Sequence, residues 1–399
     1  MDAYIDGKKQ PAHVEGLAGQ MRDHRRSHPT QVLIDLDSLA HNMRLLERLA
    51  GGRPLWPAIK ANAYGHGALI IGRHLTSLGY GTLCVAHSSE AVHLLAHGLQ
   101  ARFIVLSPGL PENMTEIAAY GLEPFVCDLA QVAALSVAAR RTNRIIDVHL
   151  KVDTGMGRVG IPPEAVASFL AACKAYPLVR VKGIASHFPK ADETDKAFSR
   201  HQIDLFQTAR DAAGAFAVPY FHMANSAGIF DLPEAHFNAV RPGIAIYGLK
   251  PSPDIVNAQV NGLKPVLTLK TRITFLKDVA AGTGLSYGHR YVAPGRSHIA
   301  TIPLGYGDGL SRGLSNRLEV LIHGQRCRQV GRICMDQCLV DVTPLRGKVA
   351  PGDEVVVIGN QGNETISADE LAAKIDTINY EIVTQLADRL PRIAVTAGK

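Results

Sequence analysis

From Gln31 onward, short apolar runs alternate with amphipathic stretches of helical length, and this alternation restricts the fold more than any other feature of the sequence. Such alternation is typical of βα units that build a parallel sheet. Helices are expected, for example, over residues 112–120, 129–140, 163–176 and 194–213. Eight strand candidates can be counted, and they end near Lys60, His87, Ser107, Cys127, Asp153, His187, Asn225 and Arg241. Strands at this spacing predict a (β/α)8 TIM-like barrel, in which functional side chains gather at the carboxyl ends of the strands.

The segment before the first barrel strand and the last third of the chain have a different texture. Residues 32–36 are expected to be extended, and Asp37 to cap a helix over 38–49. Past Gly262, Gly and Pro separate short β-branched runs at 268–276, 297–303, 318–323 and 354–358. One late helix is expected over 368–375, because it follows Ser367 and has Glu370 in its first turn, a plausible capping arrangement. The sequence therefore predicts an extension over 1–30, a barrel domain over 31–262 and a C-terminal β-rich domain over 263–399.

Composition excludes several classes of protein. A chain of 399 residues with 46% hydrophobic content can bury a large core, and no apolar run is long enough to span a membrane. The first thirty residues are polar and lack the apolar region of a secretory signal. Six cysteines without CxxC spacing indicate reduced thiols in a cytoplasmic protein and no zinc site. The net charge of +6 is not gathered in a basic stripe, which argues against nucleic-acid binding and favours a small anionic ligand.

Lys60 ends an apolar stretch, directly before a Gly-rich turn within residues 58–67. A lysine becomes a nucleophile or base only where desolvation or a nearby cation lowers its pKa, and the end of a buried strand provides that setting. The position suits a lysine that forms a Schiff base. Taken alone it is weak evidence, because most lysines simply lie at the surface.

The loops after the seventh and eighth expected strands read Asn225-Ser226-Ala227-Gly228 and Arg241-Pro242-Gly243-Ile244. Phosphate sites in such barrels recur in these two loops, where small residues let the backbone approach an anion. Taken singly, both sequences are ordinary turn formers. Arg241 would lie at the barrel mouth, as a clamp for a carboxylate, a partner for a ring nitrogen or a surface ion pair.

Two further segments carry candidate chemistry. After the fifth strand, Arg158 follows a glycine-punctuated loop and could bind a carboxylate. Lys151 is expected to point into the barrel, where its charge must be paired or chemically masked. In the second domain, Tyr287 lies between glycines in an expected turn. To act as a base near neutral pH, it would need a nearby cation such as Arg158 or His187. The alternative interpretation is an ordinary tyrosine on a hairpin.

Together these segments resemble the alanine racemase family, pyridoxal-phosphate enzymes with an N-terminal barrel and a C-terminal β domain. The resemblance runs from about residue 32 to residue 392. The motifs that carry it lie at residues 58–67, 151–158, 225–227, 240–248, 285–288, 331–337 and 378–381.

The resemblance implies a two-base racemisation of a small amino acid. Lys60 would hold pyridoxal 5'-phosphate and take the α-proton from the D-isomer, while Tyr287 would serve the L-isomer from the opposite face. Two bases are needed because a planar carbanion must be reprotonated from the face opposite to deprotonation. In the family, Tyr287 would come from the partner subunit, which implies a homodimer with shared active sites.

The family pattern also assigns the remaining residues. Arg241 would face the pyridine nitrogen with His222 in support, and His187 would support the site. The other cofactor-binding residues would be Tyr64, Asn225, Ser226, Gly243, Ile244 and Tyr380. The substrate carboxylate would be held by Arg158, Met335 and Asp336. Lys151 matches a lysine that is carbamylated in some members. A narrow access corridor would be lined by Asp192, Tyr306, Arg312, Arg332 and Ile378, beside which Lys190 departs from the smaller or neutral residues common in relatives.

Three alternatives share parts of this pattern. A broad-specificity amino-acid racemase has the same Lys and Tyr pair, but those relatives are typically exported. A pyridoxal-phosphate carrier protein has the barrel without the β domain. A basic-amino-acid decarboxylase would have glycine-rich phosphate loops and an acid at the ring nitrogen, and the sequence shows neither. The expected role is to supply D-alanine for peptidoglycan or to serve alanine catabolism.

Overall fold

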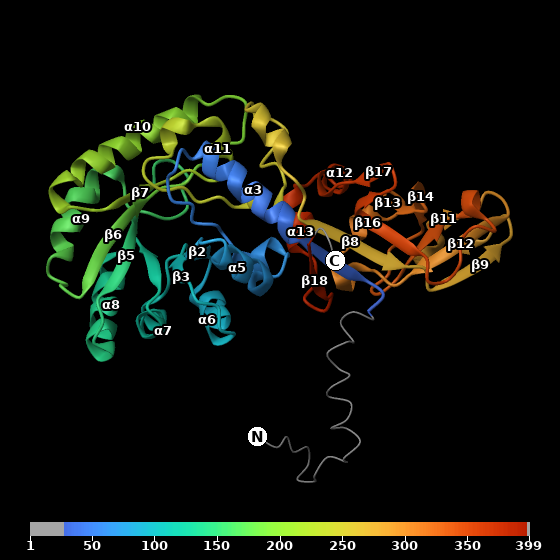
Figure 1. The fold of residues 1–399 in the computed structure, drawn as a ribbon, viewed down its shortest axis with the longest axis horizontal. Coiled ribbons are helices and arrows are strands. Elements are labelled where there is room, and N and C mark those ends of the chain that lie inside the picture. The colour runs from blue at the N-terminus through green and yellow to red at the C-terminus, as the bar shows by residue number, and fades with distance from the viewer. Residues whose placement is uncertain (1–27, 397–399) are drawn as a thin grey trace, which may run out of the picture. The chain divides into compact units, whose positions relative to one another are not determined.

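The computed structural model describes residues 28–396, which form two compact units (Figure 1). The barrel unit is Asp35–Val266, and the β unit consists of the chain before Asp35 together with Leu267–Val395. Nearly all of the expected extension over residues 1–30 lies outside the described residues. Within the described part of the chain, no helix combines the length and the apolar character that crossing a membrane requires.

A parallel sheet forms the wall of the barrel unit. Its strands follow the chain in the order β2-β3-β4-β5-β6-β7. They are β2 (Thr82–Val85), β3 (Arg102–Val105), β4 (Glu123–Val126), β5 (Ile146–Lys151), β6 (Val179–Ala185) and β7 (Tyr220–His222). The two remaining expected strands, near Lys60 and Arg241, are extended segments that close the ring through bridges, Ala58 to Cys84 and Leu55 to Val240. The (β/α)8 prediction is thus confirmed, with two irregular strands.

Prolines explain the irregularity of these two segments. Pro54, Pro57 and Pro242 lack the backbone N–H that a regular ladder needs. The remaining groups still pair, since Trp56 N–H donates to Val240 O at 2.9 Å. Closure therefore depends on a few hydrogen bonds around Lys60 and Arg241 rather than on full strands.

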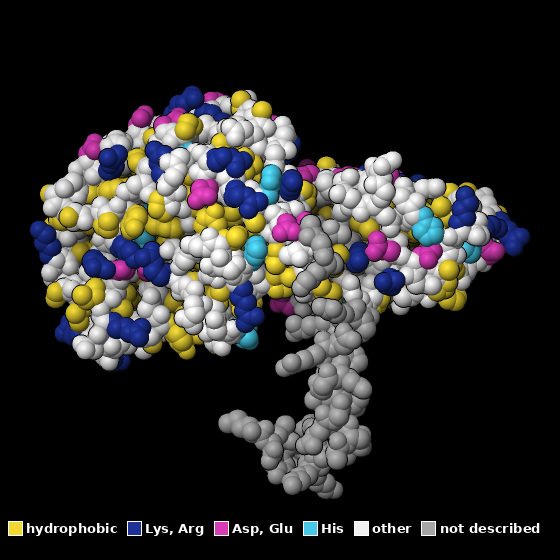
Figure 2. Space-filling view, viewed as in Figure 1, with side chains coloured by type: hydrophobic (Ala, Val, Ile, Leu, Met, Phe, Trp, Pro, Cys, Tyr) yellow, Lys and Arg dark blue, Asp and Glu magenta, His cyan; other side chains and the backbone are white. Residues whose placement is uncertain are grey.

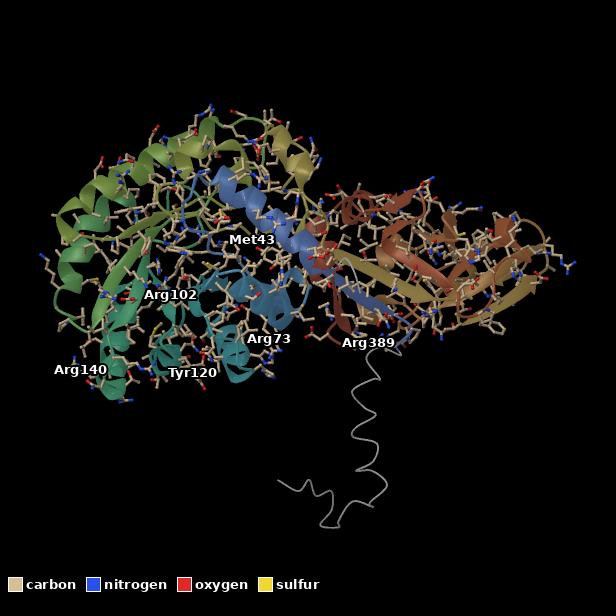
Figure 3. All side chains as sticks on the ribbon, viewed as in Figure 1. Met43, Arg73, Arg102, Tyr120, Arg140 and Arg389 are labelled. Carbon is tan, nitrogen blue, oxygen red and sulfur yellow. The ribbon has the colours of Figure 1, made fainter. Side chains whose placement is uncertain are left out.

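Helices cover the outside of the strands, as Figure 1 shows for α8, α9 and α10. Their bounds are α3 (Leu36–Leu49), α5 (Ala68–Ser77), α6 (Ser88–Ala96), α7 (Met114–Tyr120), α8 (Leu129–Thr142), α9 (Val166–Cys173), α10 (Ala197–Ala212) and α11 (Ser226–Asp231). The helix expected from Asp37 starts earlier, because Asp35 is the cap and accepts from the N–H groups of Asp37 and Ser38 at 2.9 and 3.0 Å. Met43, labelled in Figure 3, packs from α3 into the core and is fully buried.

The β unit is built on one large antiparallel sheet in the order β18-β1-β8-β16-β13-β14-β15-β12-β9, with β17 paired to β16. The strands are β1 (Gln31–Asp35), β8 (Leu267–Arg272), β9 (Phe275–Val279), β12 (Ser297–Ile302), β13 (Glu319–Ile322), β14 (Gln325–Val330), β15 (Cys338–Asp341), β16 (Glu354–Gln361), β17 (Glu364–Ile366) and β18 (Arg392–Val395). A separate pair joins β10 (Gly284–Leu285) to β11 (Tyr291–Val292), and two short helices are α12 (Ala368–Ala373) and α13 (Asn379–Thr384). The β-rich second domain is confirmed.

The first strand of this unit differs from the sequence expectation, whereas the start of its late helix agrees with it. The strand at residues 31–35, which the sequence groups with the barrel, pairs with β8, with Val32 opposite Leu269. Val32 and Ile34 are fully buried and alternate with half-exposed neighbours, the pattern of a strand covered on one face. The late helix starts where expected, because the Ser367 hydroxyl accepts from Glu370 N–H at 3.0 Å.

Candidate active site

Lys60 opens a turn, α4 (Lys60–Tyr64), that has the opposite hand to an ordinary helix. Ala61, Asn62, Ala63 and Tyr64 all have φ between +51° and +55°. This left-handed conformation costs about 1–2 kcal/mol for each residue with a Cβ, so surrounding contacts must hold it. Ala63 N–H donates to Ile59 O at 2.8 Å within the turn. Backbone strain of this kind clusters at functional sites, which supports the interpretation of Lys60.

Buried aromatic rings support the turn from beneath. The Tyr247 hydroxyl donates to Ala58 O at 2.8 Å, its ring stacks on His66 at 4.4 Å, and the Tyr64 ring lies 5.2 Å away. Burial and the positive charge of Arg158 lower the pKa of Lys60, and Glu90 opposes them. The amine of Lys60 is therefore more readily unprotonated than that of an exposed lysine.

Arg241 is buried at the end of the eighth extended segment, and its terminal nitrogens are occupied. Nη1 donates to Nδ1 and the backbone oxygen of His222, and Nη2 donates to Ser186 O at 2.7 Å. Nε has no acceptor among residues 28–396 and remains available to a ligand. Burial lowers the pKa of Arg241 to about 10, which still leaves it protonated at neutral pH.

A chain of hydrogen bonds continues from Arg241 through the barrel core. An arginine can only donate, so Nδ1 of His222 accepts and its Nε2 carries the hydrogen. That hydrogen goes to Nδ1 of His149 at 2.9 Å, and Nε2 of His149 donates to Glu123 Oε2 at 3.2 Å. Burial lowers the pKa of both histidines, so both are neutral and their tautomers are fixed by the chain.

Glu123 ends this chain at the amino end of β4. Its Oε1 accepts from Lys182 Nζ at 2.7 Å and lies 3.5 Å from Nε of Arg102, which Figure 3 labels at the start of β3. Burial alone would raise the pKa of Glu123, but hydrogen bonds from His149 and Lys182 outweigh it and leave that pKa below its usual value. The carboxylate is therefore charged at neutral pH and anchors the chain of hydrogen bonds.

The two loops expected to bind phosphate lie against each other. The Ser226 hydroxyl accepts from the N–H groups of Gly243 and Ala245 at 2.9 and 3.2 Å. A Cβ at residue 243 would lie 2.7 Å from the Tyr64 hydroxyl, so any other residue there would force the buried Tyr64 side chain to shift. Tyr64 and Ser226 thus converge on the backbone at Gly243, and we call this arrangement the cradle.

Local structure keeps this cradle in place. The Asn225 side chain accepts from Gly228 N–H at 3.0 Å and caps α11, while Ile244 begins the 3-10 helix η5 (Ile244–Tyr247). N–H groups in the first turn of a helix have no partner within it, so that of Ile244 is free of its own helix. Burial raises the pKa of Tyr64, so its hydroxyl remains a donor.

The loop after β5 carries Arg158, and the strand end carries Lys151. Asp153 accepts from the N–H groups of Gly155 and Gly157 at 2.9 and 3.1 Å and so shapes the loop, in which Arg158 is exposed. Lys151 is 3% exposed and donates to Val152 O at 2.9 Å. Burial, followed by the charge of Arg241, lowers the pKa of Lys151 to about 7, although Asp153 opposes this shift.

The loop after β6 carries three of the remaining expected residues. His187 is half-buried, and burial together with the charges of Arg241 and Lys151 holds its pKa well below the ordinary value, so it is neutral. Asp192 is half-buried in the same loop. Lys190 forms an ion pair with Glu193 at 3.1 Å, and both side chains are about half exposed, so its charge is locally balanced.

In the β unit, Tyr287 opens the 3-10 helix η7 (Tyr287–His289) and its side chain is 69% exposed. The preceding Ser286 has φ of +61° and donates its hydroxyl hydrogen to Arg332 O at 2.6 Å. A Cβ on Gly288 would lie 3.4 Å from the Arg332 guanidinium. The structure therefore brings Arg332 beside the turn that presents Tyr287.

Met335, Asp336 and Tyr306 lie in two loops that are tied together. Met335 O accepts from Gly307 N–H at 2.8 Å, directly after Tyr306. Arg389, labelled in Figure 3, binds Asp336 and Asp308, each at 2.7 Å. The carboxylate of Asp336 is thus used to anchor its loop, while Met335 remains 54% exposed.

The other expected residues of the β unit are spread over two short elements. Arg312 begins the 3-10 helix η9 (Arg312–Leu314), Ile378 caps α13, and Tyr380 lies in α13. Ile378 is 61% exposed, which is unusual for a large apolar side chain. Tyr287 and Met335 are likewise large side chains that are more than half exposed.

Three residues that support the site were not assigned roles from the sequence: Glu90, Glu123 and His149. The sequence features that could have indicated them involve only neighbouring residues in the chain. Glu123 starts a strand that is otherwise apolar, and a carboxylate there must find partners. Glu90 stands three residues after His87, the spacing at which a glutamate caps a helix. Neither signal reveals partners from distant parts of the chain.

Comparisons with known proteins agree over almost the whole chain. The models of the alanine racemase N-terminal and C-terminal domains match residues 34–251 and 266–394. An alanine racemase of Halothermothrix orenii is 42% identical, with 92% of this chain and 97% of that protein covered. The alanine racemase structure from Clostridium difficile 630 has a TM-score of 0.88 at 31% identity, covering 93% and 97% of the two chains. That from the D-cycloserine producer Streptomyces lavendulae has a TM-score of 0.86 at 37% identity, covering 92% and 97%.

A barrel of parallel strands, followed along the chain by an antiparallel β-rich domain, defines a class of two-domain barrel proteins. The matches name the family within that class. The chain belongs to the alanine racemase family.

Proposed function

We propose that the protein interconverts L- and D-alanine with pyridoxal 5'-phosphate and two bases, Lys60 and Tyr287. The observation that carries this proposal is the setting of Lys60: a desolvated amine on a strained left-handed turn, beside a cradle for an anion. The names of the relatives support alanine as the substrate.

The residues of the barrel end fit the cofactor. Tyr64 and Ser226 and the bare backbone at Gly243 suit its phosphate, together with the N–H of Ile244 and the loop capped by Asn225. The free Nε of Arg241 suits the ring nitrogen, with His222 fixing the guanidinium. By the family pattern, Tyr380 would be a further ligand of the phosphate.

Once bound to Lys60, the cofactor ring withdraws electrons and makes the α-hydrogen of an amino acid acidic. Lys60 would then move the α-proton on the face of the D-isomer, because its lowered pKa leaves the amine able to accept a proton near neutrality. Tyr287 would do so on the face of the L-isomer. The ring nitrogen would stay unprotonated against the protonated Arg241, which limits side reactions.

The substrate carboxylate would be held by Arg158 and the N–H of Met335, with Asp336 fixing that loop through Arg389. We infer that Tyr287 is supplied by a partner subunit, since its exposure suits a residue that completes another subunit's site. By the family pattern, the corridor residues Tyr306 and Arg312 would also belong to the shared site. The protein would act as a homodimer.

Lys151 is proposed to carry a carbamate. Its amine nitrogen would bond to the carbon of CO2 and release one proton, which requires an unprotonated amine, and its pKa of about 7 provides one. The resulting negative charge would be neutralised by the neighbouring cations Arg158 and Arg241, which act on Lys151 in the present structure. The group would then orient Arg158 toward the substrate.

We propose a cytoplasmic enzyme that supplies D-alanine for peptidoglycan or feeds alanine catabolism.

The test combines labelling with product analysis. Borohydride reduction of the cofactor-loaded protein, followed by peptide mapping, should place the cofactor on Lys60 and nowhere else, and Lys60→Ala should lose the label. Chiral chromatography after separate incubation with L-alanine, L-serine, L-lysine and L-arginine should give D-alanine with at most a trace of D-serine. Comparable D-lysine or D-arginine would indicate a broad-specificity racemase. Bound cofactor without any product would contradict catalysis and indicate a carrier.

A further inference from the structure

Glu90 forms an unusual set of bonds near Lys60. Its Oε1 accepts from Ala61 N–H at 2.6 Å, and its Oε2 accepts from the N–H groups of Ala86 and His87 at 2.7 and 3.2 Å. Ala61 is the first left-handed residue after Lys60, and Ala86 and His87 follow β2. One carboxylate therefore joins two strand ends of the barrel.

Helix capping accounts for only half of this arrangement. A glutamate at the third position of a helix commonly reaches back to the N–H before the helix, as Glu90 does to His87. The bond from Ala61, which is 29 residues earlier, serves no helix end of α6. It satisfies the N–H directly after Lys60, at the point where the backbone enters the left-handed turn.

We propose that Glu90 is a positioning residue that clamps the left-handed turn carrying Lys60 to the loop after β2. This inference rests on the proposed role of Lys60 in racemisation. The clamp works because a left-handed run of residues with Cβ atoms does not persist without external restraint. Its negative charge also acts on the amine of Lys60, against the cations Arg158 and Arg241.

Glu90→Gln is the informative substitution. An amide presents one oxygen and one NH2 group, so a donor would face either Ala61 N–H or Ala86 N–H, and one side of the clamp would open. Glu116→Gln is the matched control, because Glu116 is a half-buried glutamate in the first turn of α7, which follows the next strand.

We expect Glu90→Gln to lower kcat for alanine racemisation by about 10- to 100-fold, since small misplacements of a reacting group have effects of this size. In the full-length protein freed of cofactor, reductive methylation of Lys60, followed by mass spectrometry, reports the pKa of its amine. Loss of the Glu90 charge should move the midpoint of that pH profile downward by about 0.5 unit or more. Glu116→Gln should change neither quantity.

Wild-type kcat and an unshifted methylation profile in Glu90→Gln would overturn the clamp. If that variant does not fold, amide hydrogen exchange in the wild type decides: Ala61 N–H should exchange at least about tenfold more slowly than a free peptide amide, and exchange at the free rate would refute the bond. The proposed racemase activity and the Glu90 clamp can each be contradicted without the other. A wild-type protein that does not racemise alanine contradicts the proposed function, while methylation and exchange still test the clamp.

Discussion

Lys151 shows how one buried charge makes stability depend on pH. Its folded pKa is about 7 against an ordinary value of 10.5. Between these values the unfolded chain binds a proton that the folded chain lacks, so stability rises with pH across this window. Below pH 7 both states are protonated, and the full cost of burying the ammonium is present.

Lys151→Met is therefore expected to stabilise the protein at low pH in CO2-free buffer. The Tm should rise by about 5 °C at pH 6.5, corresponding to a gain on the order of 2 kcal/mol. The difference from wild type should shrink as the pH approaches 10. Differential scanning calorimetry across this range measures it, and a lower Tm of the variant at pH 6.5 would contradict the account.

Residues of the site differ in how far sequence alone identifies them. Lys60, Ser226 and Arg241 follow expected strand ends, and the chain order of a barrel is enough to bring strand ends together. Glu90 was missed because its bond to Ala61 depends on the left-handed turn, which no residue preference indicates: Ala61 and Ala63 are poor residues for that conformation. Glu123 was missed because its partners come from separate strands.

Among the elements, the left-handed turn after Lys60 should respond to a glycine substitution differently from an ordinary helix, and the Tm reports this difference. In a right-handed helix, Ala to Gly costs about 1 kcal/mol, but glycine has no penalty at positive φ. Ala61→Gly should therefore leave the Tm unchanged or raise it slightly. Ala134→Gly, in the middle of the right-handed α8, should lower it by about 2–4 °C. Equal losses in both variants would show that the turn is not left-handed in solution.

The helices and strands differ in how well the sequence predicts them. The helices of the barrel were predictable from their apolar periodicity, and Ser367 was predictable as a cap from its type and position. The sequence grouped residues 31–35 with the barrel, whereas they pair with β8; the alternation of Val32 and Ile34 reveals a half-covered strand but not which sheet contains it. The closed ring of eight strands was predicted, but not the irregularity that Pro57 and Pro242 give to two of them.

At the scale of the whole molecule, a shared site predicts complementation between two inactive variants. Lys60→Ala and Tyr287→Phe each remove one of the two proposed bases. If each site takes Lys60 from one subunit and Tyr287 from the other, a mixed dimer contains one intact site and one doubly altered site. Random pairing of equal amounts should then restore about one quarter of wild-type activity.

Co-expression of the two variants with different affinity tags, followed by tandem purification, isolates the mixed dimer for assay. Its activity per dimer should be about half that of wild type. Activity no greater than that of the parent variants would mean that each subunit carries both bases itself.

The most direct test of the two-base account is hydrogen exchange at the α-carbon in D2O, catalysed by cofactor-loaded Tyr287→Phe. Lys60 should still exchange the α-hydrogen of D-alanine, and with the opposite base removed that isomer should gain deuterium while almost no L-alanine forms. L-alanine should keep its α-hydrogen, as followed by proton NMR with chiral analysis of the products. Exchange of L-alanine as fast as D-alanine, or racemisation at the wild-type rate, would contradict the assignment of the two bases.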